Sequence, residues 1–322
     1  ASKQHVADIF LAHSEQRAIY SDNGSTSGKN SKTDGRVPLI GLDRVSFEST
    51  LVSLGEPSFR AKQIWHWLYY QGARTFGEMT TLPRALRTRL SDSCNIDRPS
   101  VSRLQLSEDG ARKWLIQFSD GQEVECVHIP EEDRGALCMS SQVGCTLTCK
   151  FCYTGTQKLV RNLGSGEIIN QFLIARDTIG EWPSPKNGRM ISNIVMMGMG
   201  EPLYNFDNVA RALRIIMDGE GIALSRRRIT LSTAGVIPFI QRCGRELGVN
   251  LAVSLHAVND EIRNQLVPIN KKYPIKELLD SCRRYPSGRN SRRITFEYVM
   301  LKGVNDSDAD ARALVRLLEG IP

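Results

Sequence analysis

The chain has 322 residues, 41% of them hydrophobic, which is long enough for one large domain with a smaller one attached. Its 42 lysines and arginines outnumber 35 aspartates and glutamates, and this basic balance suits a polyanionic partner. We expect neither a membrane span nor a secretion signal, because no run of about 18 apolar residues and no charged, apolar leader occurs. The eight cysteines, three of them crowded on one loop, fit a reducing cytoplasm better than a disulfide framework.

The N-terminal segment, residues 1–36, is predicted to be flexible. Residues 21–36 contain no apolar side chain that could repay the entropy of ordering them. We interpret a short apolar stretch before them, near Ile9, as a loosely attached helix.

Residues 37–100 show a helical pattern. Apolar residues from Ala61 to Tyr69 recur at the spacing i, i+3, i+4, i+7 and i+8, which marks one buried face of an amphipathic helix. Further helices are predicted over 46–54 and 83–93. Basic side chains on these helices form either a solvated face or a surface that contacts phosphates. These side chains are Arg60, Lys62, Arg84, Arg87 and Arg89.

Residues 101–133 change to the period of a strand. Asp-Gly pairs at 109–110 and 120–121 lie between apolar-rich runs, as expected of hairpin turns, and predict a β-meander over 104–129. Within it Glu125 alternates with apolar neighbours, so the pattern alone makes it a solvent-facing residue.

From residue 134 onward, strands and helices alternate. This alternation predicts βαβ units and an α/β fold whose parallel sheet forms a partial or complete barrel. The predicted strands cover 136–143, 191–198, 228–233, 250–255 and 293–300. The predicted helices cover 166–179, 207–217, 236–246, 274–284 and 307–319. In such folds the chemistry gathers at the C-terminal ends of the strands.

Three cysteines follow the first of these strands with the spacing C-x3-C-x2-C. Cys145, Cys149 and Cys152 supply three sulfurs and no fourth ligand. Structural zinc sites usually close a tetrahedron, whereas three thiolates can hold three irons of a [4Fe–4S] cluster and leave the fourth iron open. The alternatives are a zinc site completed by a distant residue and a loop of buried small side chains.

Polar segments also follow the next three strands. They are Gly198–Pro202, Ser232–Gly235 and Ser254–His256. An open iron needs a chelating ligand, and S-adenosylmethionine offers an amino and a carboxylate group. Glu201 can accept hydrogen bonds from that amino group, while the glycines at 198 and 200 permit close backbone approach. Ser232 and the segment 254–256 can hold the carboxylate or the ribose, and reductive cleavage of the cofactor then gives a carbon radical.

Here the residues resemble a known family. The cysteine motif with Gly-Met-Gly-Glu-Pro at 198–202 looks like that of a radical S-adenosylmethionine enzyme. From about residue 38 to 322 the chain closely resembles the RlmN family, the dual-specificity ribosomal RNA and transfer RNA adenine-C2 methyltransferases. The strings that carry this resemblance are Val124–Arg134, Cys138–Cys145, Leu231–Gly235, Val253–His256 and Val267–Tyr273.

The resemblance implies a fold, cofactors and partners. The fold is a partial (βα)6 barrel over 134–322, truncated before its last strand, with a helical RNA-binding domain over 37–100 and a small antiparallel β extension over 101–133. The cofactors are a [4Fe–4S] cluster on the three cysteines and S-adenosyl-L-methionine. The residues expected to hold the latter are Gly200, Glu201, Ser232, Ser254, Leu255 and His256. The partners are 23S rRNA, tRNA and a reducing electron donor such as flavodoxin, for a monomeric cytoplasmic enzyme.

The resemblance also implies a mechanism. In this family one S-adenosylmethionine methylates a cysteine near the C-terminus, and a second is cleaved to a radical that takes hydrogen from that methyl group. The methylene radical adds to C2 of an adenine, and a second cysteine resolves the protein–RNA crosslink by forming a disulfide. Cys138 is at the position that matches this second cysteine, and Glu125 is at the position that matches the family's proposed proton acceptor. On the pattern alone, Cys138 would be a buried hydrophobic residue.

One departure concerns the end of the chain. The family's methyl-accepting cysteine, a sixth strand and a cofactor-binding asparagine fall beyond Pro322. We therefore expect this polypeptide to assemble a cluster and bind S-adenosylmethionine but not to complete RNA methylation, and formation of C2-methyladenosine by it would contradict that expectation. Two alternatives remain, the related C8-methylating Cfr class of antibiotic-resistance enzymes and a noncatalytic RNA-binding protein with a structural metal. The segments 200–202 and 129–134 favour the C2 group.

Basic clusters in the catalytic region are further candidates for RNA contacts. Most such charges are solvated surface groups, and those near the strand ends can neutralise phosphates. The clusters are Arg226–Arg228, Lys271–Lys272, Arg283–Arg284 and Arg292–Arg293, with Lys158 and Arg161 after the cysteine loop.

Overall fold

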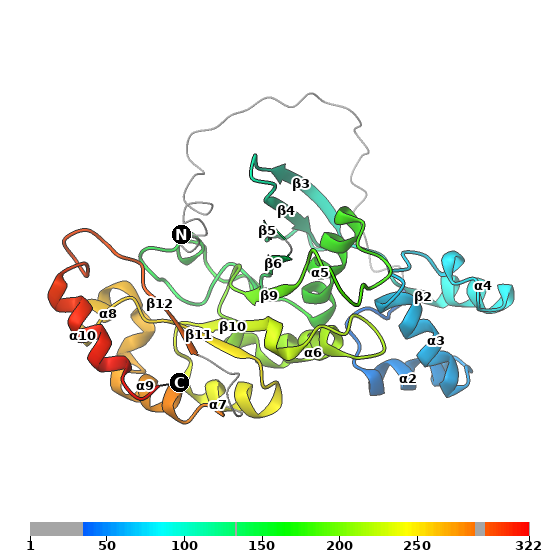
Figure 1. The fold of residues 1–322 in the computed structure, drawn as a ribbon. Helices are drawn as coiled ribbons and strands as arrows, with labels where there is room; N and C mark the ends of the chain where they lie inside the picture. Colours follow the sequence, from blue (N-terminus) through cyan, green and yellow to red (C-terminus); the bar gives the residue numbers. More distant parts are fainter. Residues whose placement is uncertain (1–34, 133, 287–293, 322) are drawn as a thin grey trace.

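The computed structural model describes residues 35–132, 134–286 and 294–321 (Figure 1). The predicted flexible segment 1–36, apart from its last two residues, and the predicted helix near Ile9 lie outside the described residues. The basic pair Arg292–Arg293 also lies outside them.

An eight-stranded sheet crosses the molecule in the order β12-β11-β10-β9-β6-β5-β4-β3 (Figure 1). The neighbouring strands from β12 to β6 are parallel. They are β6 (Arg134–Cys138), β9 (Asn193–Met196), β10 (Ile229–Thr233), β11 (Asn250–Ser254) and β12 (Ile294–Glu297). The predicted α/β architecture with a parallel sheet is therefore confirmed.

The predicted β-meander is present and extends this sheet. It consists of β3 (Ser100–Leu106), β4 (Arg112–Gln117) and β5 (Glu123–Glu131). Gly110 and Gly121 take left-handed conformations, with φ of 82° and 80°, at the two predicted hairpin turns. The antiparallel pairing of β5 with β6 joins the meander to the parallel strands.

The first parallel strand is shorter than the predicted range 136–143. The chain leaves the sheet after Cys138, because the backbone of Ser140 bonds the side chain of Gln171 instead of a neighbouring strand. Residues Gln142–Val143 form a separate strand, β7, which pairs with β8 (Arg161–Asn162).

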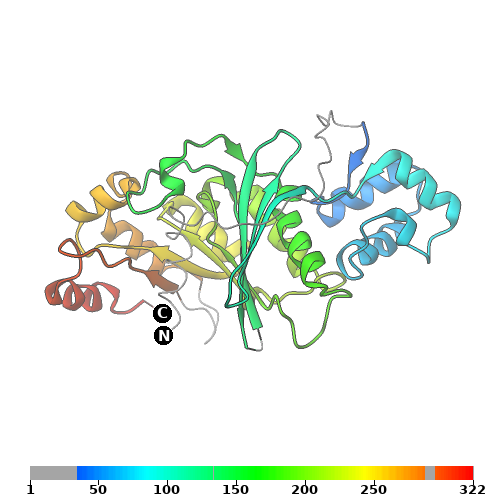
Figure 2. The ribbon, with the colours of Figure 1, turned by 90° about the horizontal axis from the view of Figure 1, so that it is seen from above.

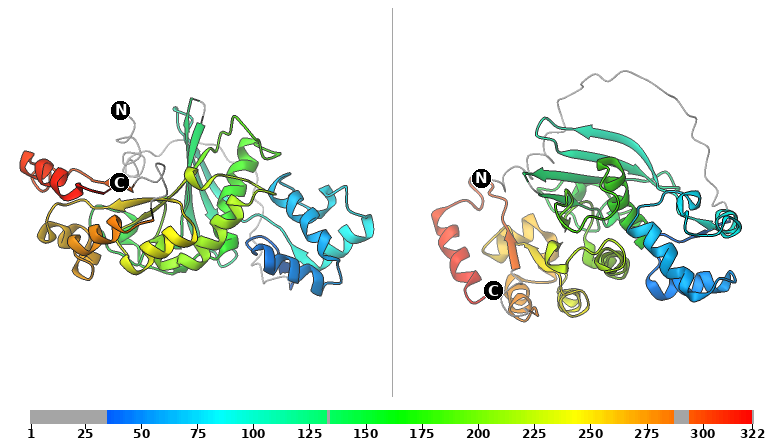
Figure 3. Two further views of the ribbon diagram at one scale, coloured as in Figure 1. Left: turned by 60° about the horizontal axis from the view of Figure 1, so that its bottom comes forward. Right: turned by 45° about the vertical axis from the view of Figure 1, so that its right-hand side comes forward.

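Helices follow the parallel strands and cover one side of the sheet (Figures 1 and 3). Apolar residues of these helices and strands form one large buried cluster, as βαβ units require, and a smaller one on which the last helix packs. The helices are α5 (Ser165–Ile179), α6 (Phe206–Met217), α7 (Ile237–Glu246), α8 (Asp260–Leu266), α9 (Ile275–Arg283) and α10 (Asp308–Leu318). Short 3-10 helices are η1 (Phe76–Glu78), η2 (Thr154–Thr156), η3 (Pro202–Asn205), η4 (Arg226–Arg228) and η5 (Pro268–Lys271). None of the described helices is long and apolar enough to cross a membrane.

The N-terminal helices form a compact group at one end of the sheet, opposite α8–α10 (Figure 2). They are α2 (Arg44–Ser53), α3 (Ser58–Tyr69) and α4 (Arg84–Ser93), accompanied by the short strands β1 (Val37–Pro38) and β2 (Cys94–Asn95). The predicted apolar face of α3 is buried throughout.

Contacts at Arg44 and at Gly41 are among those that fix the helical group to the barrel. Arg44 makes two hydrogen bonds, of 2.9 and 2.7 Å, to the carboxylate of Asp218 after α6. Gly41 lies directly against the first turn of α5, and a Cβ atom there would clash with the backbone nitrogen of Gly166. Ser165 donates a 2.7 Å hydrogen bond to the Gly41 carbonyl at the same place.

Candidate active site

The strand register collects polar side chains on the face of the sheet that the helices leave uncovered. Residues paired directly across two strands point to the same face. Cys138 pairs with Val127 of β5, and Glu125 is two residues before Val127, so Glu125 and Cys138 share a face. Ser232 of β10 lies on this face as well. Cys138 pairs with Val195, Val195 pairs with Thr230, and Ser232 is two residues after Thr230 on the same strand.

The same face continues to the last described strand. Ser232 pairs with Ala252 of β11, and Ser254, two residues later, pairs with Glu297 of β12. The hydroxyl groups of Ser232 and Ser254 donate to the same oxygen of Glu297, at 3.3 and 2.9 Å. Glu297 was missed by the sequence analysis, although its alternation with Phe296 in a predicted strand could have placed it on the polar face.

The cysteine loop leaves the C-terminal end of β6, as predicted. Gly155 of η2 packs on this loop so closely that a Cβ atom there would lie 2.6 Å from the Cys149 carbonyl oxygen. Burial raises the pKa of Cys145 to about 11 and that of Cys149 to about 12, and the charges of the neighbouring cysteines add to the second shift. The Cys152 amide donates to the Cys149 carbonyl at 3.2 Å, so the loop turns tightly where it carries these cysteines.

The three cysteine sulfurs of the loop are ligands of the type that an iron–sulfur cluster uses. In the described part of the chain, no three cysteine, histidine or acidic side chains are arranged closely enough to hold a single metal ion. A cluster spreads its three cysteine ligands over separate irons, whereas one zinc ion needs its ligands drawn together around it. Bound iron stabilises cysteine side chains as thiolates, so metal binding would offset the burial that raises the pKa values of Cys145 and Cys149.

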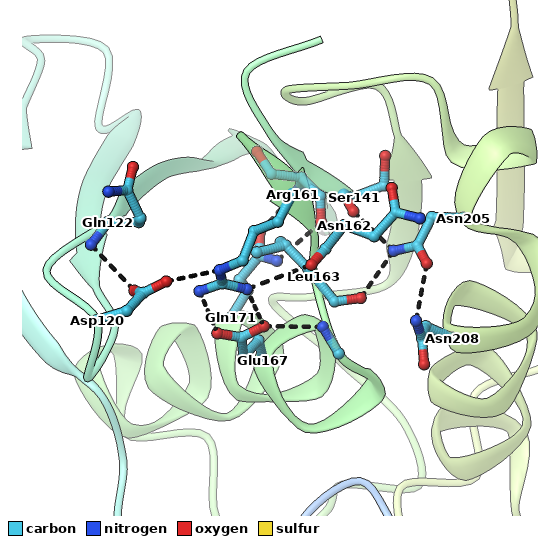
Figure 4. Close-up of polar contacts among 12 residues, drawn as sticks. Asp120, Gln122, Ser141, Arg161, Asn162, Leu163, Glu167, Gln171, Asn205 and Asn208 are labelled. Carbon is cyan, nitrogen blue, oxygen red and sulfur yellow. Dashed lines mark hydrogen bonds and ion pairs between the residues drawn. The ribbon is translucent and has the colours of Figure 1, made fainter. Parts of the chain in front are cut away.

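The cysteine loop is anchored on both sides. On one side, the Lys150 amide donates to the Leu266 carbonyl of α8 at 3.0 Å, and the ring of Phe151 meets His256 edge-on with centroids 4.4 Å apart. On the other side, Arg161 of β8 makes ion pairs with the carboxylates of Asp120 and Glu167 (Figure 4). These pairs tie the strand after the loop to the β4–β5 turn and to α5, so the role of Arg161 in this structure is to hold the loop in place.

A second set of hydrogen bonds fixes the backbone that leads into the loop. Asn205 donates from Nδ2 to the carbonyl oxygens of Ser141 and Leu163, at 2.8 and 2.7 Å (Figure 4). Gln171 of α5 accepts from the Ser140 amide and donates to the Ser140 carbonyl. The path from β6 to the cysteines is thus held by side chains of neighbouring helices.

Glu201 lies at the rim with a buried side chain. Its Oε2 accepts from the Ala234 amide at 2.8 Å and its Oε1 from the Leu203 amide at 3.1 Å. Burial raises the pKa of this carboxyl to about 7, and the two backbone donors oppose that shift. Gly200 has φ of 96° and packs on Gln142, so a side chain at this position would be strained and would clash.

Two family models match most of the chain. The model described as the Radical SAM superfamily matches residues 139–315. The model described as the ribosomal RNA large subunit methyltransferase N-terminal domain matches residues 37–96.

Curated relatives cover most of the chain as well. The dual-specificity RNA methyltransferase RlmN of Rhodospirillum rubrum is 64% identical over 89% of this chain and 67% of its own length. That of Gluconobacter oxydans is 61% identical over 90% of this chain and 72% of its own. The chain belongs to the RlmN family of radical SAM RNA methyltransferases. A crystal structure of a radical SAM methyltransferase from Sphaerobacter thermophilus agrees with its fold, with a TM-score of 0.82 and 45% identity over 88% of this chain and 82% of that one.

In this member of the RlmN family, Cys138 is a buried thiol that its surroundings keep protonated. Burial raises the pKa of Cys138 to about 12, and the charges of Glu297 and Glu125 act in the same direction, against a backbone hydrogen bond at Met197. Glu125 is not simply solvent-facing, because it forms a 2.9 Å ion pair with Lys113 of β4. It also shares with Cys138 the face of the sheet that the helices leave uncovered, here called the inner face. The carboxylate and the thiol are therefore held on adjacent strands.

The remaining two predicted residues of this RlmN-family chain have packing contacts. The Leu255 side chain is buried beside Ile275 and Leu279, and its backbone amide and carbonyl are both hydrogen-bonded. His256 has φ of 58° and accepts at Nδ1 from the Val299 amide, and burial lowers its pKa to about 3. The imidazole is thus a neutral group at the rim, packed against the cysteine loop.

Proposed function

We propose that this protein methylates C2 of a specific adenosine in 23S rRNA and of an adenosine in tRNAs, with two molecules of S-adenosyl-L-methionine and a [4Fe–4S] cluster on Cys145, Cys149 and Cys152. The observation that carries this proposal is the shared inner face of Glu125 and Cys138 on the strands that lead to the three thiols. Adenine C2 is electron-poor, so a polar methyl transfer to it would fail and a radical route is required.

The bound cofactors would supply a 5′-deoxyadenosyl radical at the rim. Glu201 would accept hydrogen bonds from the amino group of S-adenosylmethionine, since each of its oxygens retains a lone pair beside its backbone donor. Ser232 and Ser254 donate their hydroxyl protons to Glu297, so their oxygens can accept from the cofactor.

Glu125 and Cys138 would act on the RNA adduct. Once the adduct has lost its unpaired electron, which the bound cluster would accept, the Glu125 carboxylate would take the proton from C2. Cys138, as thiolate, would then attack the sulfur of the methylene-bridged cysteine and form a disulfide. The electron pair of the broken S–CH2 bond would stay on the methylene carbon, which takes a proton to become the methyl group and frees the RNA. The high pKa of Cys138 means that its proton must be removed at this stage. A thiol kept protonated until then cannot react with other electrophiles at the rim.

Iron loading tests the first part of the proposal. Anaerobic reconstitution should give about four irons and four sulfides per chain, and replacement of the three loop cysteines by alanine should abolish both iron loading and reductive cleavage of S-adenosylmethionine. Stoichiometric zinc in place of iron would support the noncatalytic RNA-binding alternative.

Isotopic labelling tests the position of methylation. The protein expressed from its natural gene would be given RNA with deuterium at adenine C2 or at C8, and the product adenosine would be analysed by mass spectrometry. We expect loss of deuterium from C2 and its retention at C8. The reverse pattern would assign the protein to the C8-methylating class.

The RNA partners are proposed to contact the N-terminal helices and the basic clusters near the rim. Lys62 and Arg84 have exposed side chains on α3 and α4. Arg89 makes an ion pair with the buried Glu56 and is less available to a phosphate. An external one-electron donor of the flavodoxin class would reduce the cluster.

A further inference from the structure

Arg263 of α8 is a fully buried arginine beneath the rim. Its Nε donates to the Leu255 carbonyl at 2.9 Å, and its Nη2 donates to the carbonyls of Ala234 and Ser254 at 2.8 and 3.0 Å. Its Nη1 donates to Oδ1 of Asn270 at 2.7 Å. All four acceptors are neutral, so these bonds satisfy the guanidinium without neutralising its charge.

Two other buried arginines form ion pairs with carboxylates. Arg176 forms a 3.2 Å ion pair with Glu181, and Arg98 forms a 3.1 Å ion pair with Asp177. In the described part of the chain, no ion pair joins Arg263 to a carboxylate. A buried charge is costly unless an opposite charge lies near it.

Burial lowers the pKa of Arg263, and Cys149, ahead of Asp260 and Cys282, is the group whose negative charge would oppose that shift most. Cys149 carries this charge once a bound metal holds it as a thiolate. The cysteine loop is also fixed to α8 directly, through the bond from the Lys150 amide to the Leu266 carbonyl. Arg263 and the cysteine loop are therefore neighbours with a fixed relative position.

Accepting the cluster of the proposed function, we propose that Arg263 is a positioning residue that balances the cluster's negative charge and makes it easier to reduce. Three thiolates outweigh the positive charge of the oxidised cluster core, and one electron from the external donor adds a further negative charge. A fixed cation beside the cluster stabilises the reduced state more than the oxidised state. The guanidinium has one more N–H donor, on Nη1, than its four described hydrogen bonds use.

A purely mechanical role for Arg263 makes a different prediction. If Arg263 only joined the ends of β10 and β11 to η5 through its hydrogen bonds, lysine and glutamine would replace it equally badly. Neither side chain can reach four separate acceptors. A charge role predicts that Arg263→Lys retains the reduction potential and Arg263→Gln does not. Arg245→Gln removes one positive charge from the exposed surface of α7 and serves as the matched control.

The test is an anaerobic redox titration, followed by electron paramagnetic resonance, of the reconstituted protein and these three variants. For Arg263→Gln we expect the equilibrium constant for one-electron reduction to fall at least about tenfold, a shift of about 59 mV to more negative potential. For Arg263→Lys and Arg245→Gln we expect a change of less than about threefold, because the charge is kept or is screened by solvent. A loaded Arg263→Gln protein whose potential is unchanged would overturn the proposal.

Folding and cluster loading are scored separately. If Arg263→Gln does not fold, as judged by near-ultraviolet circular dichroism, Arg263→Met is titrated in its place beside Arg263→Lys. A difference of about tenfold between the two supports the charge role, and equal potentials contradict it. Failure of the unaltered protein to load iron would contradict the proposed function itself, whereas a loaded cluster whose potential ignores position 263 would contradict only this inference.

Discussion

Ser254 donates a 2.9 Å hydrogen bond to Oε2 of Glu297, the residue that faces it across β11 and β12. Ser232 donates to the same oxygen from the next strand. One carboxylate thus orients two hydroxyl groups at the rim, where both serines are proposed to hold the cofactor.

Removal of the Glu297 carboxylate should weaken cofactor binding. In Glu297→Ala the two hydroxyl groups lose their common acceptor and can turn their protons toward the ligand's own donors. Loss of charge-assisted hydrogen bonds on this scale should weaken the affinity for S-adenosylmethionine by about tenfold, measured by calorimetry on the cluster-loaded protein. Thr295→Ala, at an exposed position on the same face of β12, should bind normally. Equal affinities for the two variants would disprove this role of Glu297.

The titration of Glu201 should appear in the stability of the chain without cofactor. Its pKa is raised from 4.5 to about 7 by burial, so between these values the folded chain holds a proton that the unfolded chain has released. The free energy of unfolding should therefore fall as the pH rises through this window, by on the order of 3 kcal/mol for this group.

Urea unfolding of the unaltered chain and of Glu201→Gln, at several pH values across the window, measures this effect. The glutamine variant should lack this part of the pH dependence because it has no proton to lose. Identical pH dependence in both proteins would show that Glu201 titrates normally.

The fit of Gly155 against the cysteine loop predicts a loss of cluster loading in Gly155→Ala. A Cβ atom at this position would lie 2.6 Å from the Cys149 carbonyl oxygen, so the loop must move. We expect a loss of unfolding free energy of about 1–3 kcal/mol and a reduced iron content after reconstitution. Gly219→Ala is the control, because nothing lies within 4 Å of a Cβ atom there. Iron content that is equal in both variants would contradict the expected movement.

Charge reversal on the N-terminal helices should weaken RNA binding. Lys62→Glu and Arg84→Glu should each reduce the affinity for rRNA or tRNA fragments and lower the salt dependence by about one ion, if each side chain contacts a phosphate. The salt dependence of filter binding or fluorescence anisotropy provides the measurement. Glu48→Lys on α2 reports whether net charge alone is responsible, since it changes the charge in the opposite sense.

Much of the fold could be predicted because local patterns and tertiary contacts agree. The spacing of apolar residues in α3 and the Asp-Gly turns of the meander each depend on a few neighbouring positions, and the structure keeps them. The end of β6 could not be predicted in this way. It is set by Gln171, a residue about thirty positions later, whose side chain takes the place of a neighbouring strand.

The candidate site shows the same division. The cysteines and Glu201 belong to short motifs, so spacing was enough to select them. Glu297 and Arg263 belong to no motif. The proposed role of Glu297 depends on the pairing of β11 with β12, and that of Arg263 on the neutral acceptors that bind its buried guanidinium. The roles of the predicted site residues stay predictions until the variants above are measured.

The contact of Gly41 with the first turn of α5 has a consequence for the substrate. Two backbones meet there without space for a single methyl group, and Arg44 adds a hydrogen-bonded ion pair with Asp218 between the same two parts of the chain. Movement of the helical group relative to α5 would separate that junction. An RNA that touches both regions would therefore meet a fixed spacing, and RNAs already bent or unpaired at the target adenosine would fit it at the lowest energetic cost.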